Sequence, residues 1–333
     1  MEKICIGIDI AKESFVTALP CDSKKKFKTE KHAYKSPSDI AKFISTLDKD
    51  KHICVMEATG VYHKRLAYAL YDANIPVCVV NPASIKFHTR MKNSITKTDE
   101  KDAKDIAIYG AEQKPVLYEK PTEVQDGFAQ KRALLSILQK QVQMLKNQLE
   151  SVSHQPQQDK YVADILKKQI ATLEKQIEDV KEKMKGIVKN DFSEDYKLLL
   201  SVPAIGDAVA TELIDALSTF SCTEEKNASK AFCKFVGLVP CISESGTSVR
   251  KSQHITRSSV PTLRSKIYIA TCATINHSSP ETKNPIRDTF NRLREKGKTY
   301  KQALVAAMHK VVRIAFAVLI NRVPFDPNFI STK

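Results

Sequence analysis

Short apolar runs alternate with amphipathic segments through the first third of the chain. The apolar runs predict five β-strands, at residues 3–10, 14–19, 27–34, 52–57 and 76–80. The amphipathic segments predict helices at residues 36–47, 62–73 and from Thr98 onward. The first three strands follow each other through tight connections, which favour antiparallel pairing. The order of elements predicts an α/β domain over residues 1–125.

Between residues 126 and 190 the apolar positions follow a different rhythm. Leu138, Val142, Leu145, Leu149 and Val152 are separated by alternating steps of four and three. Similar steps resume after His154-Gln155-Pro156, on a second segment rich in Lys, Gln and Glu. Heptad-like spacing of this kind predicts a coiled-coil helical arm, folded back at the proline. A helical pair packed on its own domain is the alternative.

The last part, residues 191–333, is predicted to be a mainly α-helical domain. The segment 198–206 contains a small turn with a glycine and runs into an apolar helix from Val209 to Leu217. The most apolar segment, Ala303 to Ile320, is interrupted by three basic or histidine side chains. It therefore predicts a buried helix rather than a membrane span.

The net charge of the chain indicates what kind of partner it binds. The chain has 333 residues and a net charge of +15, with 53 Lys and Arg against 38 Asp and Glu. Such a surplus favours a polyanionic partner, most often nucleic acid. The 8 cysteines form no C-x-x-C pair and sit mostly in apolar runs. With no signal peptide recognised, they indicate reduced thiols in a cytoplasmic protein and not a disulfide framework or a zinc site.

Four acids are the candidate chemistry of the α/β domain. Asp9 and Glu57 end two predicted strands, and Asp99 and Asp102 share one face of the helix that opens at Thr98. Ligands of such folds bind at the carboxyl ends of parallel strands, so neighbouring first and fourth strands would gather these carboxylates. Carboxylates that repel each other are commonly held together by a divalent metal. Local roles as helix or turn caps are the alternative for each acid.

The strand order and the acids resemble the ribonuclease-H-like fold, in its RuvC-type branch. More narrowly, the segments that resemble the DEDD transposases of the insertion sequence 110 family, which includes the Piv-type invertases, are 7–12, 56–60, 79–82 and 97–103. The resemblance implies that Asp9, Glu57, Asp99 and Asp102 bind Mg(II), with Asp105 as a neighbour. The spacing of the acids does not distinguish one ion from two.

A second set of motifs lies in the last domain. Gly237-Leu238-Val239-Pro240 followed by Ser245-Gly246 resembles the second domain of the same family. The resemblance implies that Ser245 attacks DNA, with Ser243 as the alternate, although a Ser-Gly dipeptide by itself is usually a turn. The segment 202–206 resembles a helix-hairpin-helix element, with Ala204 where that motif usually has glycine. An ordinary connection between core helices is the alternative.

Several basic side chains are candidates for nucleic-acid contacts: Arg250, Lys251, Arg257, Arg264, Arg292 and Arg294. Contacts of this type to phosphates position a nucleic acid without reading its sequence. Solvated helix faces are the alternative. The family resemblance further implies donor and target DNA, a non-coding guide RNA, and a homo-oligomer (dimer or tetramer) built through the arm, with no membrane association.

Three functions were weighed. The leading hypothesis is a DNA transposase or site-specific recombinase of a prokaryotic mobile element, working at the nucleoid. It would cleave and rejoin strands through metal-bound acids and the Ser245 nucleophile. The runner-up is a metal-dependent nuclease of the Holliday-junction resolvase type, which uses water and needs the acids but not Ser245. The third is a DNA-binding scaffold in which the acids are structural.

Overall fold

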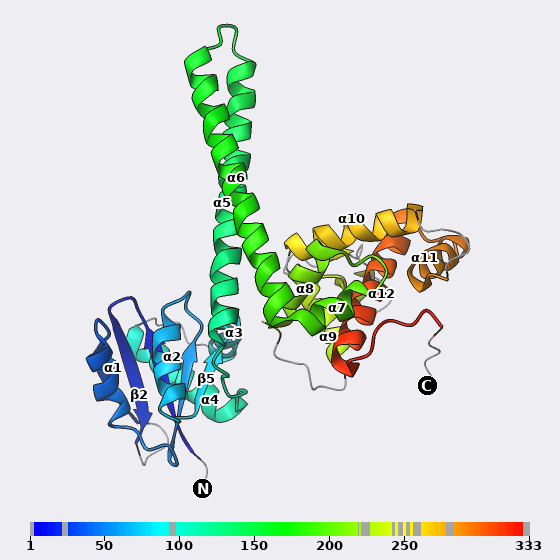
Figure 1. Cartoon of the computed structure of the whole chain (residues 1–333). Coiled ribbons are helices and arrows are strands. Elements are labelled where there is room, and N and C mark those ends of the chain that lie inside the picture. Colours follow the sequence, from blue (N-terminus) through cyan, green and yellow to red (C-terminus); the bar gives the residue numbers. More distant parts are fainter. Residues whose placement is uncertain are drawn as a thin grey trace. The chain divides into compact units, whose positions relative to one another are not determined.

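The computed structural model describes residues 3–21, 26–92, 98–218, 220, 227–241, 244–245, 249–250, 254–255, 261–277 and 283–328. The chain divides into two compact units, residues 1–121 and 122–333. The first unit is built on a β-sheet, and the second is mostly helical (Figure 1). The division into three domains at residues 125 and 190 stays a prediction.

The sheet of the first unit has five strands among the described residues, in the order β3-β2-β1-β4-β5. The strands are β1 (Ile4–Ile10), β2 (Ser14–Pro20), β3 (Phe27–Ala33), β4 (His52–Glu57) and β5 (Val77–Val80). β1, β2 and β3 pair antiparallel, whereas β1, β4 and β5 pair parallel. The predicted antiparallel group is therefore confirmed, and the first and fourth strands are neighbours.

Helices cover both faces of this sheet. They are α1 (Pro37–Ile44), α2 (His63–Asp72), α3 (Pro82–Met91) and α4 (Asp99–Gln113). Alternate residues of a strand point to opposite faces. Met56 of β4 accordingly packs with α1 and α2, whereas its neighbour Val55 packs with Ile106 of α4. The sequence analysis did not predict α3, which begins with an Asn81 cap and a proline in its first turn.

The second unit begins with two long helices, α5 (Glu123–Ser153) and α6 (Lys160–Asp191), which form a hairpin (Figure 1). The predicted stepping of apolar positions is seen in their packing. The buried residues shared along the pair are Leu138, Val142, Ile170, Ile177, Val180 and Met184. Leu145, Leu149, Leu173 and Ile187 are partly buried against them.

The remaining helices form the body of the second unit. They are α7 (Ser193–Leu200), α8 (Asp207–Ser218), α9 (Ala228–Val236), α10 (Pro261–His277), α11 (Pro285–Glu295) and α12 (Tyr300–Asn321). In the described part of the chain, α12 is the one helix whose length and apolar composition would suit a membrane span. Its residues Leu304, Val311 and Phe316 are buried in the core of the unit, in agreement with the predicted buried helix.

Several thiols are buried, as the cysteine pattern predicts. Cys54, Cys78 and Cys233 are buried and free. Burial raises the pKa of the Cys78 thiol to about 11 and that of the Cys233 thiol to about 12. Thiols with such pKa values stay protonated at neutral pH and are poor nucleophiles. These three cysteines therefore act as small apolar core residues.

A buried ion pair joins the hairpin to the body of the second unit. Arg132 of α5 donates to a carboxylate oxygen of Asp215 in α8, and the Asp215 side chain is only 4% exposed. We expect Arg132→Ala to lower the free energy of unfolding by about 2–3 kcal/mol, because the substitution leaves the buried Asp215 carboxylate without its partner. The effect is moderate because the Arg132 side chain is itself partly exposed to solvent. Denaturant unfolding measures this loss, and Lys146→Ala, which removes the exposed pair with Glu174, is the control with little change.

This loss should depend on pH. Burial raises the pKa of Asp215, although the charge of Arg132 opposes the effect. A carboxyl with a raised folded-state pKa favours folding more as the pH falls, because the folded state then holds its proton more tightly. The destabilisation by Arg132→Ala should thus be largest at neutral pH and shrink in acid. An equal loss at both would contradict a buried, unpaired carboxylate.

Candidate active site

Two of the predicted acids stand next to each other at one end of the sheet. β1 and β4 pair parallel with Ile8 opposite Met56, so Asp9 and Glu57 occupy the next position on each strand. Neighbouring strands lie roughly 4.8 Å apart. By alternation both acids point to the same face as Gly7 and Val55, which is the face that α4 covers. Both side chains are half-buried.

The acidic first turn of α4 lies at the same end of the sheet. Thr98 caps this helix as predicted, accepting a hydrogen bond from the Lys101 N–H at 3.3 Å. Ala103 packs with Val16, the β2 residue that pairs with Asp9. The adjacent Asp102 is half-buried, whereas Asp99 is exposed. The backbone thus brings the start of α4 towards the strand ends that hold Asp9 and Glu57.

The acids do not form a finished metal site as they stand. Within the described residues, no three acidic, histidine or cysteine side chains have an arrangement that could hold a metal ion. Asp105 lies on the following turn of α4 and is half-buried. Assignment of Asp9, Glu57, Asp99 and Asp102 as metal ligands therefore stays a prediction, supported by the shared strand register and the place of α4.

Gly7 sets the distance between α4 and the strands. A Cβ added to Gly7 would lie 2.0 Å from the Ala103 carbonyl oxygen and 2.4 Å from the Ala107 nitrogen. We expect Gly7→Ala to push α4 away from β1 and to lower the free energy of unfolding by about 3 kcal/mol, because backbone atoms cannot move aside as a side chain can. Thermal or denaturant unfolding measures this change.

The control for this variant is Gly186→Ala in α6, where no atom lies within 4 Å of the added Cβ. Alanine favours a helix over glycine by up to roughly 1 kcal/mol, so the control should be neutral or slightly stabilised. Equal stability of Gly7→Ala and the native chain would mean that α4 does not rest on β1 as described.

His63 is a residue that the sequence analysis missed. It opens α2 after the loop that follows Glu57, and its side chain is 8% exposed. Burial lowers the pKa of His63, and hydrogen bonds to the backbone at Thr59 and Gly60 act in the opposite direction. The His63 side chain thus lies beside the loop that leaves Glu57. A single histidine before an apolar helix face gave no signal of this role.

The described residues around the candidate serine form short paired strands. β6 (Pro240–Cys241) pairs antiparallel with β9 (His254–Ile255), and β7 (Glu244–Ser245) with β8 (Val249–Arg250). Sequence periodicity did not predict these strands. The backbone of Ser245 lies opposite Val249. Ser243, Lys251 and Arg257 fall outside the described residues.

The other predicted nucleic-acid residues lie on two helices. Arg264 is partly buried on α10, and Arg292 and Arg294 are exposed on the last turn of α11. Arg294 donates to the Lys298 carbonyl oxygen at 2.7 Å. α10 and α11 pack against each other. Their contact with a nucleic acid stays a prediction.

The turn that resembles a helix-hairpin-helix element has the backbone of a glycine. Ala204 takes φ of +70°, in the left-handed region that L-residues rarely adopt. The following helix start is occupied, because Asp207 accepts hydrogen bonds from the Tyr196 hydroxyl and the Lys185 ammonium, both at 2.6 Å. Burial and the Asp207 charge raise the pKa of Tyr196 to about 12. This carboxylate favours a structural connection over a phosphate-binding turn.

Comparisons with known proteins agree with these features. Residues 6–155 match the model of a DEDD transposase family, and residues 196–287 match the Transposase IS116/IS110/IS902 family. The pilin gene-inverting proteins of Moraxella bovis and Moraxella lacunata are each 27% identical to this chain over 336 aligned residues. Each alignment covers 98% of this chain and 98% of the relative.

Proposed function

Because this chain belongs to the IS116/IS110/IS902 family of transposases, we propose that it cuts and rejoins DNA through metal-bound carboxylates and a serine nucleophile. Membership makes the chain a DNA recombinase, an enzyme that acts on DNA. The observation that carries the finer proposal is the parallel register of β1 and β4. It sets Asp9 beside Glu57 under the acidic start of α4.

The proposal includes a ribonuclease-H-like fold for the first unit. The strand order β3-β2-β1-β4-β5, with three antiparallel strands followed by parallel ones, supports it. In such a sheet the carboxyl ends of the parallel strands lie at the same end of the sheet. Asp9 and Glu57 lie at that end in this chain, which is where a RuvC-type resolvase domain would need its acids.

The donor chemistry of the acidic cluster fits magnesium. Its four members, all oxygen donors of the type that hard cations prefer, are Asp9, Glu57, Asp99 and Asp102. When bound there, magnesium would supply Lewis-acid polarisation of a scissile phosphate. The carboxylates would hold and orient it, and α4 would carry two of them to the strand ends. One or two ions satisfy this donor set equally.

Ser245 is the proposed nucleophile. Its hydroxyl oxygen would bond to the phosphorus while the bond from phosphorus to a deoxyribose oxygen breaks, and the serine proton ends on the departing hydroxyl. The resulting phosphoserine ester keeps the energy of the phosphodiester. A hydroxyl of a second strand then reverses the step, joins the new strand and returns the proton to Ser245. The name of the two relatives supports rejoining, since inverting a gene requires it.

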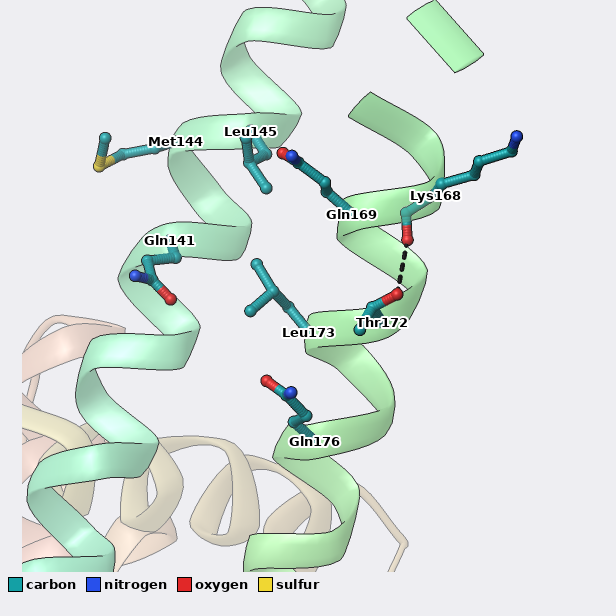
Figure 2. Close-up of a pocket in the computed structure, with 8 residues that line it drawn as sticks. All are labelled: Gln141, Met144, Leu145, Lys168, Gln169, Thr172, Leu173 and Gln176. Atoms are coloured by element: carbon teal, nitrogen blue, oxygen red, sulfur yellow. Dashed lines mark hydrogen bonds between the residues drawn. The ribbon is translucent and has the colours of Figure 1, made fainter. Parts of the chain in front are cut away.

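The proposed partners are donor and target DNA, a non-coding guide RNA and further copies of the chain. Oligomerisation is supported by apolar side chains that the helical hairpin leaves uncovered. Leu134, Ile137 and Met144 of α5 are 46%, 53% and 69% exposed. Met144 also lines a groove of about 460 Å³. Figure 2 shows Leu145 of α5 and Leu173 of α6 pointing toward each other in this groove. We place the assembly at the nucleoid, in the prokaryotic cytoplasm.

The test is a cellular assay with the chain expressed beside its own flanking DNA. Sequencing should find excised and rejoined junctions that join the flanks without loss of bases. Broken ends without junctions would favour the runner-up, a junction-type nuclease that uses water. Neither ends nor junctions, with the purified chain folded and bound to DNA, would contradict the proposed activity for this chain.

A further inference from the structure

A groove on the second unit has no role in the functions discussed above. It lies between α9 and α12 and has a volume of about 410 Å³. We call it the cationic groove. It is lined by Lys230, Ala231, Lys234, Val239, His309 and Arg313. Three of the six carry a permanent positive charge, and Ala231 and Val239 give it an apolar floor.

The spacing of the polar residues makes this a shared surface of two helices. Lys230 and Lys234 are four residues apart on α9, and His309 and Arg313 are four apart on α12. Residues at this spacing share one face of a helix. The two faces meet at the groove because α9 and α12 pack together, through Phe232 and Phe316 among others.

Among the described residues, the cations of the groove have no counter-charge. Lys230, Lys234 and Arg313 are exposed, and in the described part of the chain no carboxylate lies within ion-pair distance of them. Elsewhere in the same unit, by contrast, Lys266 is paired with Glu212. Like charges on one surface repel each other, so an anion bound there would relieve an unfavourable interaction.

His309, the fourth polar residue of the groove, is affected by the same positive charges. Burial lowers the pKa of His309, and the charge of Arg313 lowers it further. At neutral pH the side chains that line the groove thus carry two ammonium groups, one guanidinium and a neutral imidazole. Ammonium and guanidinium groups are the usual partners of phosphate oxygens. The apolar surface formed by Ala231 and Val239 suits the sugar of a nucleotide. A free carboxylate or sulfate would leave this surface uncovered.

The groove also lies close in sequence to the candidate serine. Val239 lines the groove and directly precedes β6, and Ser245 follows in β7. The six steps along the chain from Val239 to Ser245 span at most about 20 Å even when extended. A nucleic-acid strand held in the groove is therefore within a few nucleotides of Ser245.

We propose that the cationic groove binds the phosphodiester backbone of a nucleic-acid strand and so positions it beside Ser245. This inference rests on the proposed function for its purpose, but the binding itself does not. The contacts are to phosphates, so they add affinity and place the strand without reading its sequence. DNA and RNA share this chemistry, and the experiment separates the two.

The experiment measures binding by fluorescence anisotropy, with the full chain and a labelled DNA duplex or an RNA of the same sequence. Arg313→Gln and Lys234→Gln should each weaken binding roughly five- to tenfold, since each removes one charged contact. The dependence of log affinity on log salt should also lose about 0.7–0.9 per contact. Lys310→Gln is the matched control, because Lys310 is an exposed cation of α12 that does not line the groove.

Each outcome decides the matter. Loss with either nucleic acid, together with native-like binding by Lys310→Gln, supports the groove, and the probe that loses affinity identifies the strand. Native affinity of the two groove variants, or an equal loss in Lys310→Gln, overturns it. Matching thermal unfolding of all three variants rules out misfolding. Ser245→Ala should bind as the native chain does, so failure of the serine chemistry and failure of the groove are distinguishable.

Discussion

Ser245→Ala is expected to abolish rejoined DNA junctions, by roughly 10⁴-fold or more, because no oxygen remains to bond to the phosphorus. DNA binding should survive, since the substitution removes a single hydroxyl. The measurement is the number of junctions per cell by sequencing, next to the affinity of the purified variant for DNA. Together they separate loss of chemistry from loss of substrate.

Ser243→Ala is the control for this variant. Ser243 lies two residues away and was the alternate candidate in the sequence. It should leave junction formation near the native level. If junctions persist in Ser245→Ala and disappear in Ser243→Ala, the nucleophile is Ser243. If neither variant loses them, the strand is transferred without either serine.

Asp102→Asn should reduce strand cleavage roughly 10³-fold, the equivalent of about 4 kcal/mol of transition-state stabilisation. The amide keeps the size of the side chain but not its charge, so a magnesium ion would be held weakly. The expected signature is cleavage that requires more magnesium than the native chain does. A plasmid or oligonucleotide cleavage assay with a magnesium titration measures both quantities.

Asp105→Asn is the matched control, with the same chemical change one turn along α4. Both aspartates are half-buried, so a general effect on helix stability would appear in both variants. We expect Asp105→Asn to cleave at close to the native rate. Equal losses in the two variants would assign the acids a structural role, as the scaffold hypothesis requires.

Local sequence patterns predicted the strands and helices that have a clear apolar run or capping residue. Short apolar runs predicted the strands of the sheet, and Thr98 was identified as the cap of α4. α3 was missed because Asn81-Pro82 had been interpreted as a family motif and not as a helix start. Strands of two residues such as β7 are too short to show any periodicity.

Features that depend on residues far apart in the chain could not be predicted from the sequence. The pairing of β1 with β4 was only a condition in the prediction, because strand neighbours are set by the whole sheet. The Arg132–Asp215 pair joins residues 83 positions apart, and no local pattern marks either partner. The cationic groove likewise requires α9 and α12 to pack together before Lys234 and Arg313 share a surface.

The proposed mechanism requires a covalent bond between Ser245 and DNA. The most direct measurement is to trap this intermediate on a nicked substrate that cannot be rejoined, then to digest the complex and locate the modified peptide by mass spectrometry. We expect a nucleotide attached to the peptide that contains Ser245, formed with magnesium and absent from both Ser245→Ala and Asp102→Asn. Cleaved DNA with no nucleotide on the protein, or a nucleotide on a different residue, would contradict it.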